Sequence, residues 1–527
     1  MQFPDSSSAG GGMTLSDQMA RHARRTPDAV AIRHDGAGTT YRELDHEVNR
    51  LARVLGDRGI GPGDRVAVLA HNHPVIVVAI LACTRIGAIA VPLNFRCVAA
   101  EIEYMLADCG AVFLVVDTHC AAVASAALPA VDAVRGGLMV GSPGTSAELP
   151  FDDYADSLAA ASGPAVESVV DERTPALIMY TSGTTGRPKG AVLTHHNLFV
   201  QVTSRIAHSG TPTTCRVWLV ATPLFHIGGI SALLHSVYLG GTLVIAGSRT
   251  FDPAAIVELF ESERVSSCFL VPQQWQAVCA VPGIAERDLS ALTAIAWGGA
   301  PASTTLLRTL IDTFPGAELS TSFGQTECSP VTTVLRGSDA TRKIGSIGTP
   351  LLNVEVRLVD AEMNDVAHGE VGEIVYRGPS VMSGYWNKPE ENAAAFRGGW
   401  FHSGDLVRED EDGYLYLVDR LKDMIISGGE NIYCAEVENT IAAHPAVAEV
   451  AVIGLPDRRW GEVPHAVIVT RPSATPPSDA EVEQWCRDRL AGYKCPRHIT
   501  LAPELPRNAG GKVMKAELRT RAQPVNK

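Results

Sequence analysis

The sequence predicts an α/β fold, with mainly parallel sheets flanked by helices and a smaller α+β unit at the C-terminal end. Short apolar runs alternate with candidate helices over roughly the first 300 residues, as in βαβ units. After about residue 350 the runs alternate apolar and polar residues, which is typical of half-buried antiparallel strands. At 527 residues the chain is also too long for one simple core, so two or more domains are expected.

In the first part of the chain, a helical pattern with an apolar stripe extends from about Leu15 to Leu55. A buried strand is expected at Ala176–Met179, and a helix is expected from near His195. The stretch Gly136–Pro164 is rich in small residues and is expected to form a loop. The other predicted buried strands are Val66–Leu69, Ala88–Val91, Val112–Val116, Val217–Ala221, Thr242–Ala246, Ser267–Val271 and Ala294–Trp297.

The C-terminal part is expected to begin near Asp419–Asp423. This boundary divides the chain into a flexible leader (1–12), an N-terminal domain (13–420) and a C-terminal domain (421–527). A helix is predicted at Ala435–Ala443, and the proline-rich Arg471–Pro477 is a surface loop. The predicted half-buried strands are Val354–Val359, Gly372–Tyr376 and Tyr414–Val418, with a further strand at Glu449–Ile453.

Composition indicates a soluble, cytoplasmic protein. The chain is 46% hydrophobic and 19% charged, and its net charge of −14 argues against a nucleic-acid partner. Its 11 cysteines form no C-x-x-C pair and are expected to be reduced. The leader lacks the charged and apolar regions of a signal peptide. The longest apolar run, Val75–Cys83, is far shorter than the ~20 residues of a membrane helix.

The most informative stretch is Tyr180-Thr-Ser-Gly-Thr-Thr-Gly-Arg-Pro-Lys-Gly190. Glycines let backbone N–H groups turn towards an anion, hydroxyls donate further hydrogen bonds, and a lysine adds positive charge. The spacing differs from G-x-x-x-x-G-K-[ST], because Gly183 and Gly186 are too close together and Pro188 precedes Lys189. The stretch predicts a polyphosphate-binding loop, and the alternative is a solvated surface turn.

Two further clusters have the chemistry of a nucleotide site. Small residues in Trp297–Pro301 follow an apolar strand and open space where α/β ligands bind, although a plain strand-to-helix turn is the alternative. Thr321–Glu327 combines an aromatic ring, a glycine, a hydroxyl and a carboxylate, which can stack a base, approach a phosphate and hold Mg²⁺.

Later residues add ribose and charge contacts. Asp405 can accept both hydroxyls of a ribose, and the planar fork of Arg420 suits the same sugar or its phosphate. A domain-linking salt bridge is the alternative for this pair. Lys512 follows two glycines near the end of the chain. A mobile Gly-Gly segment would let this lysine enter an active site. The alternative is a lysine that is simply a solvated surface charge.

From about Leu15 to Arg519 the chain resembles the adenylate-forming superfamily of acyl-CoA synthetases, luciferases and nonribosomal-peptide adenylation domains. The segments that carry the resemblance, in the family order, are Tyr180–Gly190, Pro223–Gly229, Phe323–Glu327, Trp400–Leu406, Asp419–Tyr433 and Pro506–Lys512. The resemblance implies a large N-terminal domain with a distorted β-barrel subdomain and a small, mobile C-terminal domain. It also implies two half-reactions: a carboxylate attacks the α-phosphate of ATP to give an acyl-adenylate and pyrophosphate, and a thiol then displaces AMP.

The resemblance assigns roles at the nucleotide. The loop Thr181–Lys189 would hold the β- and γ-phosphates, Thr326 the α-phosphate and Glu327 the Mg²⁺ with Thr184. Asp405 and Arg420 would hold the ribose, and Lys512 would neutralise charge as pyrophosphate leaves. The implied nucleotide contacts are Thr181, Ser182, Gly183, Thr184, Thr185, Gly186, Lys189, Gly299, Ala300, Pro301, Ser322, Phe323, Gly324, Gln325, Thr326, Asp405, Arg420 and Lys512, of which Thr181, Glu327 and Lys512 are taken as catalytic together with His226.

The resemblance also implies a hinge and a thiol site. Lys422 occupies the hinge position, about which the C-terminal domain would exchange Lys512 for the CoA-side loop of Gly428, Gly429 and Asn431. His226 would gate the acyl site, with a satisfied structural histidine as its alternative. The expected acyl-pocket residues are His226, Gly228, Gly229, Gly298, Ser322, Ser329 and Pro330.

These pocket residues, small and uncharged apart from His226, favour a medium or long fatty acid or a bulky apolar acid, and Phe225-His226-Ile227 lacks the aspartate that binds an amino acid. The expected substrates are that acid, ATP and CoA, with Mg²⁺. The alternatives are a ligase that loads a separate carrier protein, an ATP phosphotransferase, or a non-catalytic nucleotide-binding protein. No integral membrane segment is expected, and a homodimer is left open.

Overall fold

The computed structural model describes residues 12–141, 149–166, 168–181, 187–209, 216–247, 251–299, 302–427, 430–472, 474–507 and 513–522. The chain divides into two compact units, which are described separately below. The first contains residues 1–356 and 376–401, and the second contains 357–375 and 402–527. The domain boundary expected after Arg420 therefore lies inside the second unit and stays a prediction.

One sheet of the first unit is mainly parallel. Its strand order is β19-β9-β8-β4-β3-β5-β6-β7, in which β9 and β19 form an antiparallel edge. Continuous apolar runs form its central strands because helices cover such sheets. The strands are β3 (Arg65–Leu69), β4 (Ile89–Pro92), β5 (Phe113–Asp117), β6 (Gly137–Val140), β7 (Asp152–Asp153), β8 (Pro175–Thr181), β9 (Lys189–Thr194) and β19 (Gly384–Tyr385).

The other strands of the first unit follow the order β16-β15-β14-β13-β12-β10-β11-β1-β2. Those from β14 to β1 are parallel, and antiparallel strands lie at both ends. Every strand expected in this region is confirmed within a residue or two. The expected strands are β10 (Val217–Val220), β11 (Thr242–Ile245), β12 (Ser267–Leu270) and β13 (Ala294–Trp297). The remaining strands, which the sequence analysis did not predict, are β1 (Val30–His34), β2 (Ala37–Thr40), β14 (Glu318–Phe323), β15 (Thr333–Leu335) and β16 (Ser346–Pro350).

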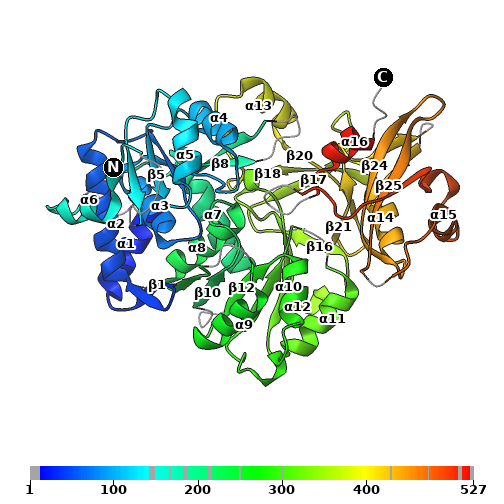
Figure 1. Cartoon of the computed structure of the whole chain (residues 1–527), viewed down its shortest axis with the longest axis horizontal. Helices are drawn as coiled ribbons and strands as arrows, with labels where there is room; N and C mark the ends of the chain where they lie inside the picture. The colour runs from blue at the N-terminus through cyan, green and yellow to red at the C-terminus, as the bar shows by residue number, and fades with distance from the viewer. Residues whose placement is uncertain are drawn as a thin grey trace, which may run out of the picture. The chain divides into compact units, whose positions relative to one another are not determined.

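The helices of the first unit lie beside these strands, with α3 next to β4, α5 next to β5 and α8 next to β10 (Figure 1). The helix α3 is buried on all sides, which explains its unbroken apolar sequence. The helices are α1 (Leu15–Arg25), α2 (Tyr41–Asp57), α3 (Pro74–Ile86), α4 (Ala99–Cys109), α5 (Ala121–Ala127), α6 (Tyr154–Ala160), α7 (His195–Ser209), α8 (Ile227–Leu239), α9 (Pro253–Ser262), α10 (Pro272–Cys279), α11 (Thr304–Thr313), α12 (Gly337–Ala340) and α13 (Pro389–Ala395), with the 3₁₀ turns η2 (Leu128–Ala130), η3 (Ile284–Glu286), η4 (Thr326–Cys328) and η5 (Arg397–Gly399).

Two sequence expectations in this unit are wrong. The helical stretch expected over Leu15–Leu55 is interrupted by the hairpin β1–β2, because β1 pairs with β11 and Ile32 lies opposite Leu243. The expected loop Gly136–Pro164 contains β6, β7 and α6. These elements form because β6 extends the sheet beyond β5 and buries Leu138. Both errors concern short elements that are stabilised by distant partners.

The second unit is built mainly of antiparallel strands. The order β17-β18-β20-β21 contains the half-buried strands predicted there, and the order β23-β22-β25-β24, with β26 beside β25, forms its other sheet. The open strand order leaves the expected barrel subdomain a prediction. The elements are β17 (Glu355–Val359), β18 (Val371–Arg377), β20 (Phe401–Glu409), β21 (Leu415–Arg420), β22 (Ile425–Ser427), β23 (Glu430–Ile432), α14 (Cys434–Ala442), β24 (Val447–Asp457), β25 (Gly461–Thr470), α15 (Asp479–Arg487), η6 (Gly492–Lys494), β26 (His498–Leu501) and α16 (Lys515–Ala522).

The strand β24 has two buried faces. Ala451 and Ile453 pack into one core cluster with Leu518, whereas Val452 packs into another with Val437. This alternation follows from the two-residue period of a strand that is covered on both sides. Among the described residues, no helix has both the length and the apolar character that crossing a membrane requires.

Candidate active site

A buried carboxylate, Glu327, lies at the centre of the candidate site. It is in η4 and only 6% exposed. Its Oε1 accepts hydrogen bonds from the Thr181 hydroxyl at 3.1 Å and the Tyr385 hydroxyl at 3.0 Å. Its backbone carbonyl accepts from the Met382 N–H at 2.7 Å. Three segments of the first unit, around Thr181, Glu327 and Met382–Tyr385, therefore meet at Glu327.

The two ends of the predicted phosphate loop lie on adjacent strands. Thr181 ends β8, Lys189 begins β9, and the two residues are opposite each other in the antiparallel register. The Lys189 ammonium lies 5.2 Å from the centre of the Tyr385 ring, within cation–π range. Both ends of the loop thus lie beside Glu327, while Ser182, Gly183, Thr184, Thr185 and Gly186 lie outside the described residues.

Tyr385 is a site residue that the sequence analysis missed. Burial, and then the negative charge of Glu327, raise the pKa of Tyr385, so the hydroxyl stays protonated and donates to the carboxylate. The pair is separated by 58 residues in the sequence. No local pattern around Tyr385 could have revealed a contact that depends on β19 pairing with β9.

The donor atoms around Glu327 suit Mg²⁺. A carboxylate oxygen and a threonine hydroxyl are the hard oxygen ligands that this ion prefers. Both come from structured positions, Thr181 at a strand end and Glu327 in a helical turn. Glu327 and Thr181 therefore fit the predicted metal, and the other predicted ligand, Thr184, lies outside the described residues.

The residues expected at the adenine lie where β13 and β14 end. These strands are parallel, so their carboxyl ends share one edge of the sheet. A Cβ on Gly298 would lie 2.5 Å from the Ser322 carbonyl oxygen, so only glycine fits there. Gly299 follows with a φ of +76°. Ser322 and Phe323 end β14, and Ala300 and Pro301 lie outside the described residues.

The segment from Gly324 to Thr326 connects β14 to η4. A Cβ on Gly324 would lie 2.1 Å from the Pro330 carbonyl oxygen, and Gln325 is the N-cap residue of η4. Ser329, the residue after η4, has a φ of 67° and is fully buried. Its hydroxyl has no hydrogen-bond partner in the described part of the chain. The turn thus fixes Thr326 and Glu327 beside the end of β14.

His226 has a structural role that the structure makes visible. Its Nδ1 accepts from the Gly228 N–H at 3.1 Å and caps the first turn of α8. Desolvation by the surrounding protein lowers the pKa of His226. The ring is therefore neutral near neutral pH. Its role as a gate stays a prediction.

A second residue missed by the sequence analysis, Phe269 on β12, lies next to the expected acyl-pocket glycines. A Cβ on Gly228 would lie 3.8 Å from the Phe269 ring, and a Cβ on Gly298 would lie 3.0 Å from it. Gly229 has a different reason to be small, because its Cβ would lie 2.5 Å from the Pro223 carbonyl oxygen. Close backbone packing, rather than pocket volume, requires that glycine.

In the second unit, Asp405 and Arg420 form an ion pair. They lie opposite each other on β20 and β21, and Arg420 Nε is 2.9 Å from Asp405 Oδ1. Ser403 accepts from the Asp405 N–H at 3.0 Å, and Glu373 accepts from the Gly404 N–H at 2.9 Å. The pair therefore links two strands of one unit, and the alternative of a domain-linking salt bridge is wrong.

The expected hinge residue, Lys422, is exposed between two fixed neighbours. The Leu421 N–H donates to the Gly404 carbonyl at 2.9 Å, and the Asp423 carbonyl accepts from the Cys434 thiol at 2.9 Å. Asn431 lies on β23 of the same unit. Gly428, Gly429 and Lys512 lie outside the described residues.

A hydroxyl- and lysine-flanked loop beside a buried carboxylate, with that carboxylate just after a strand of a parallel sheet, is the arrangement of a nucleotide-using α/β enzyme. The chain belongs to the AMP-binding enzyme family, whose model matches residues 19–386. A model of the AMP-binding enzyme C-terminal domain matches residues 436–512.

Several relatives are similar over nearly the whole chain. A feruloyl-CoA synthase from Amycolatopsis sp is 42% identical over 96% of this chain and 99% of its own length. A long-chain-fatty-acid–CoA ligase from Mycobacterium tuberculosis is 38% identical over 91% and 92%. Among solved structures, the o-succinylbenzoate CoA synthetase of Bacillus subtilis with its acyl-adenylate intermediate is 32% identical, with a TM-score of 0.84 over 97% of this chain and 98% of that one.

The protein is therefore an AMP-forming acid–thiol ligase that makes acyl- or aryl-CoA through an acyl-adenylate. Such ligases use ATP, Mg²⁺ and CoA. The fold and the superfamily expected from the sequence are confirmed. The alternatives of an ATP phosphotransferase and a non-catalytic nucleotide-binding protein are excluded.

Proposed function

We propose that this ligase activates a bulky apolar acid, and that aryl acids are better substrates than straight-chain fatty acids. The observation that carries the proposal is the Phe269 ring between Gly228 and Gly298. Because Gly228 has no side chain, a flat group can approach the ring face or edge there, whereas Gly298 lets the backbone pack closely against the ring. Phe225-His226-Ile227 supplies no carboxylate that could pair with a substrate ammonium group.

The printed names of the relatives support this choice. They include feruloyl-CoA synthase, indoleacetate–CoA ligase at 38% identity and 2-succinylbenzoate–CoA ligase at 37% identity, each acting on an acid with an aromatic ring. One relative at 38% identity is a long-chain-fatty-acid–CoA ligase. A fatty acid, which the sequence analysis also expected, is therefore the substrate class against which aryl acids must be tested.

In the proposed mechanism, the chain's own residues position ATP and neutralise its charge. The loop Thr181–Lys189 binds the β- and γ-phosphates, and Thr326 contacts the α-phosphate. Glu327 would hold Mg²⁺, which supplies positive charge where the attacking carboxylate meets the phosphates. Tyr385 donates to Glu327 and fixes the orientation of that carboxylate.

Other residues complete the two half-reactions. Asp405 accepts the ribose hydroxyls, and Arg420 pairs with the buried Asp405 and orients it. Lys512 neutralises the developing negative charge during adenylation. A rotation at Lys422 then replaces Lys512 with the loop of Gly428, Gly429 and Asn431, where the thiol enters.

The experiment is a pyrophosphate-release screen with purified protein, ATP and Mg²⁺, with and without CoA. The acids are ferulate, indoleacetate, a medium-chain and a long-chain fatty acid, and an alicyclic acid. We expect the aryl acids to have kcat/KM values at least about tenfold above the fatty acids, the scale set by pocket fit. A fatty acid with the highest kcat/KM would overturn the aryl proposal but leave the ligase class intact.

A carrier protein is the second candidate acceptor. One relative, a fatty acid–[acyl-carrier-protein] ligase from Streptomyces coeruleorubidus, is 32% identical over 96% of this chain. We propose CoA, because most of the relatives named above are CoA ligases. Formation of a CoA thioester, measured by mass spectrometry in the screen, is the expected result. Adenylate that accumulates in the presence of CoA and is consumed only by a carrier protein would favour the second candidate.

A further inference from the structure

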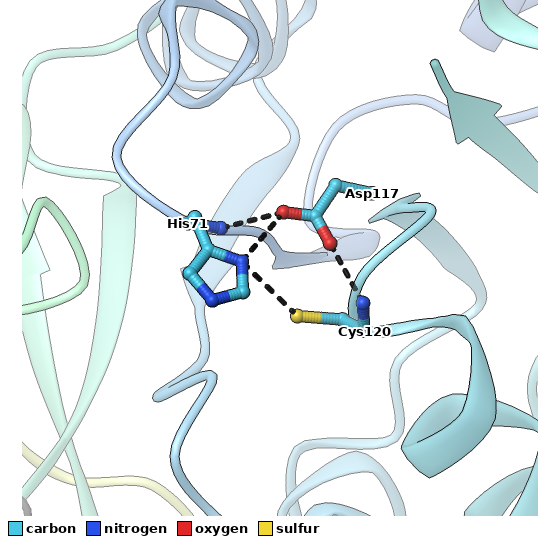
Figure 2. A group of neighbouring side chains, drawn as sticks. All are labelled: His71, Asp117 and Cys120. Atoms are coloured by element: carbon cyan, nitrogen blue, oxygen red, sulfur yellow. Dashed lines mark hydrogen bonds and ion pairs between the residues drawn. The ribbon is translucent and has the colours of Figure 1, made fainter. Parts of the chain in front are cut away.

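His71, Asp117 and Cys120 form a compact cluster in the first unit (Figure 2). His71 follows β3, Asp117 ends β5 and Cys120 immediately precedes α5. The strands β3 and β5 are parallel neighbours, so their carboxyl ends meet at one edge of the sheet. The sheet therefore brings the three side chains together.

The three side chains share one focus, the Nδ1 atom of His71. Asp117 Oδ2 lies 3.0 Å from this nitrogen, and Cys120 Sγ lies 3.9 Å from it (Figure 2). All three potential ligand atoms lie within 4.8 Å of one another. In a catalytic Cys–His–Asp relay, the thiol and the carboxylate would use different ring nitrogens. Here both face the same nitrogen, so the cluster is not arranged as a proton relay.

Three potential ligand atoms of a histidine, an aspartate and a cysteine within 4.8 Å of one another instead suit ligands that share one cation. Zinc bonds of about 2.0–2.1 Å to nitrogen or oxygen and about 2.3 Å to sulfur place tetrahedral neighbours about 3.3–3.6 Å apart. The observed 3.0 and 3.9 Å are within a few tenths of an ångström of this spacing. We propose that His71, Asp117 and Cys120 bind a zinc-type divalent cation, with water as the fourth ligand.

The environment supports an ordered site with an entry path. Asp117 is held by the backbone N–H groups of His71 at 2.8 Å and Cys120 at 2.7 Å, so its carboxylate is oriented before a metal arrives. The His71 side chain is 23% exposed, whereas Asp117 and Cys120 are buried, which leaves an approach from the histidine side. A thiol and an imidazole select zinc or cobalt over Mg²⁺, which prefers oxygen ligands.

The cluster is also connected to the acyl side of the protein. Asn72, next to His71, donates to the Thr222 carbonyl at 3.1 Å and accepts from the Leu224 N–H at 2.8 Å. Thr222 and Leu224 belong to the segment that leads to His226. The proposed site thus connects the ends of β3 and β5 to the segment before His226. A bound metal would stabilise this connection.

The test uses cobalt as a spectroscopic probe on the full chain. Titration of metal-free protein with Co²⁺ is expected to give one tight site per chain with a near-ultraviolet thiolate-to-cobalt band, which Zn²⁺ removes by competition. Cys120→Ser should lose the band, and His71→Ala should lose more affinity than the roughly 10–100-fold that removal of an outer-shell partner costs. Cys279→Ser and His46→Ala are the matched controls and should retain both.

Absence of saturable Co²⁺ binding, or an unchanged band in folded Cys120→Ser, would overturn the proposal. If Cys120→Ser does not fold by circular dichroism, X-ray absorption of the zinc-loaded native protein decides the question. One sulfur ligand per zinc supports the site, and a shell without sulfur overturns it. Binding also predicts a higher Tm with Zn²⁺, since the folded state alone holds the ligands together. These readouts do not depend on the acid that the enzyme activates.

Discussion

The phosphate end and the acyl end of the candidate site are built in opposite ways. At the phosphate end, Thr181 and Tyr385 fix one buried carboxylate by two hydrogen bonds of 3.0–3.1 Å. At the acyl end, Gly228 presents no side chain beside the Phe269 ring, and His226 is neutral. Fixed polar atoms serve a reaction that is the same for every acid, whereas space and ring faces select the acid. Substitutions at the two ends should therefore fail in different ways.

The largest effect is expected for Lys512→Ala. Loss of one preorganised charge at the transition state should lower the adenylation rate by about 10²–10³-fold. Formation of thioester from a supplied acyl-adenylate should continue, because that half-reaction uses the other conformation. ATP–pyrophosphate exchange and single-turnover thioester formation measure the two steps separately. Equal loss of both steps in folded protein would show that the proposed exchange of conformations is wrong.

Glu327→Gln tests the carboxylate itself. The substitution keeps the shape and removes the charge, so adenylation should fall by about 10²-fold and the Mg²⁺ concentration for half-maximal rate should rise. The control is Glu47→Gln, because Glu47 also accepts a tyrosine hydroxyl, that of Tyr154 at 2.9 Å. An unchanged Mg²⁺ dependence in Glu327→Gln would remove this residue from the metal site.

Tyr385→Phe tests whether orientation of Glu327 matters. A hydrogen bond to a charged group contributes about 1.5–3 kcal/mol, so loss of the hydroxyl should slow adenylation about tenfold or more. The Mg²⁺ dependence should shift in the same direction as in Glu327→Gln, which a purely structural role would not produce. Tyr154→Phe is the matched control and should keep the native Mg²⁺ profile. If Tyr385→Phe changes only the Tm and not the rate or the Mg²⁺ dependence, Tyr385 contributes to folding and does not orient Glu327.

The smallest effect on the overall reaction is expected for Gly228→Ala. The added Cβ would lie 3.4 Å from His226 Nδ1 and 3.8 Å from the Phe269 ring, so the protein should fold without a backbone shift. The ratio of kcat/KM for a bulky aryl acid to that for a small acid should fall by about tenfold. KM for ATP should not change. A uniform loss for all acids would mean that Gly228 does not shape the pocket.

Much of the architecture could be predicted because many helices and strands are determined by residues that are neighbours in the sequence. The predicted buried strands β3, β4, β5, β8, β10, β11, β12 and β13 are mainly apolar runs, and Val75–Ile86 of α3 are all buried. The exceptions are informative: the β1–β2 hairpin and the strand β6 are short, and their stability comes from pairing with distant strands. A window of neighbouring residues contains no information about such partners.

By itself, the sequence determined the class of enzyme. The Thr181–Lys189 loop, Glu327, Asp405, Arg420 and Lys512 are chemically distinctive residues at characteristic spacings, and family membership confirms the class that they indicated. The tertiary structure alone decided which atoms meet: Glu327 bonds to Thr181 across 146 residues and to Tyr385 across 58. It also brought His71 to Asp117 across 46 residues. Residue chemistry is local, but a site forms only where the sheets place the ends of distant strands side by side.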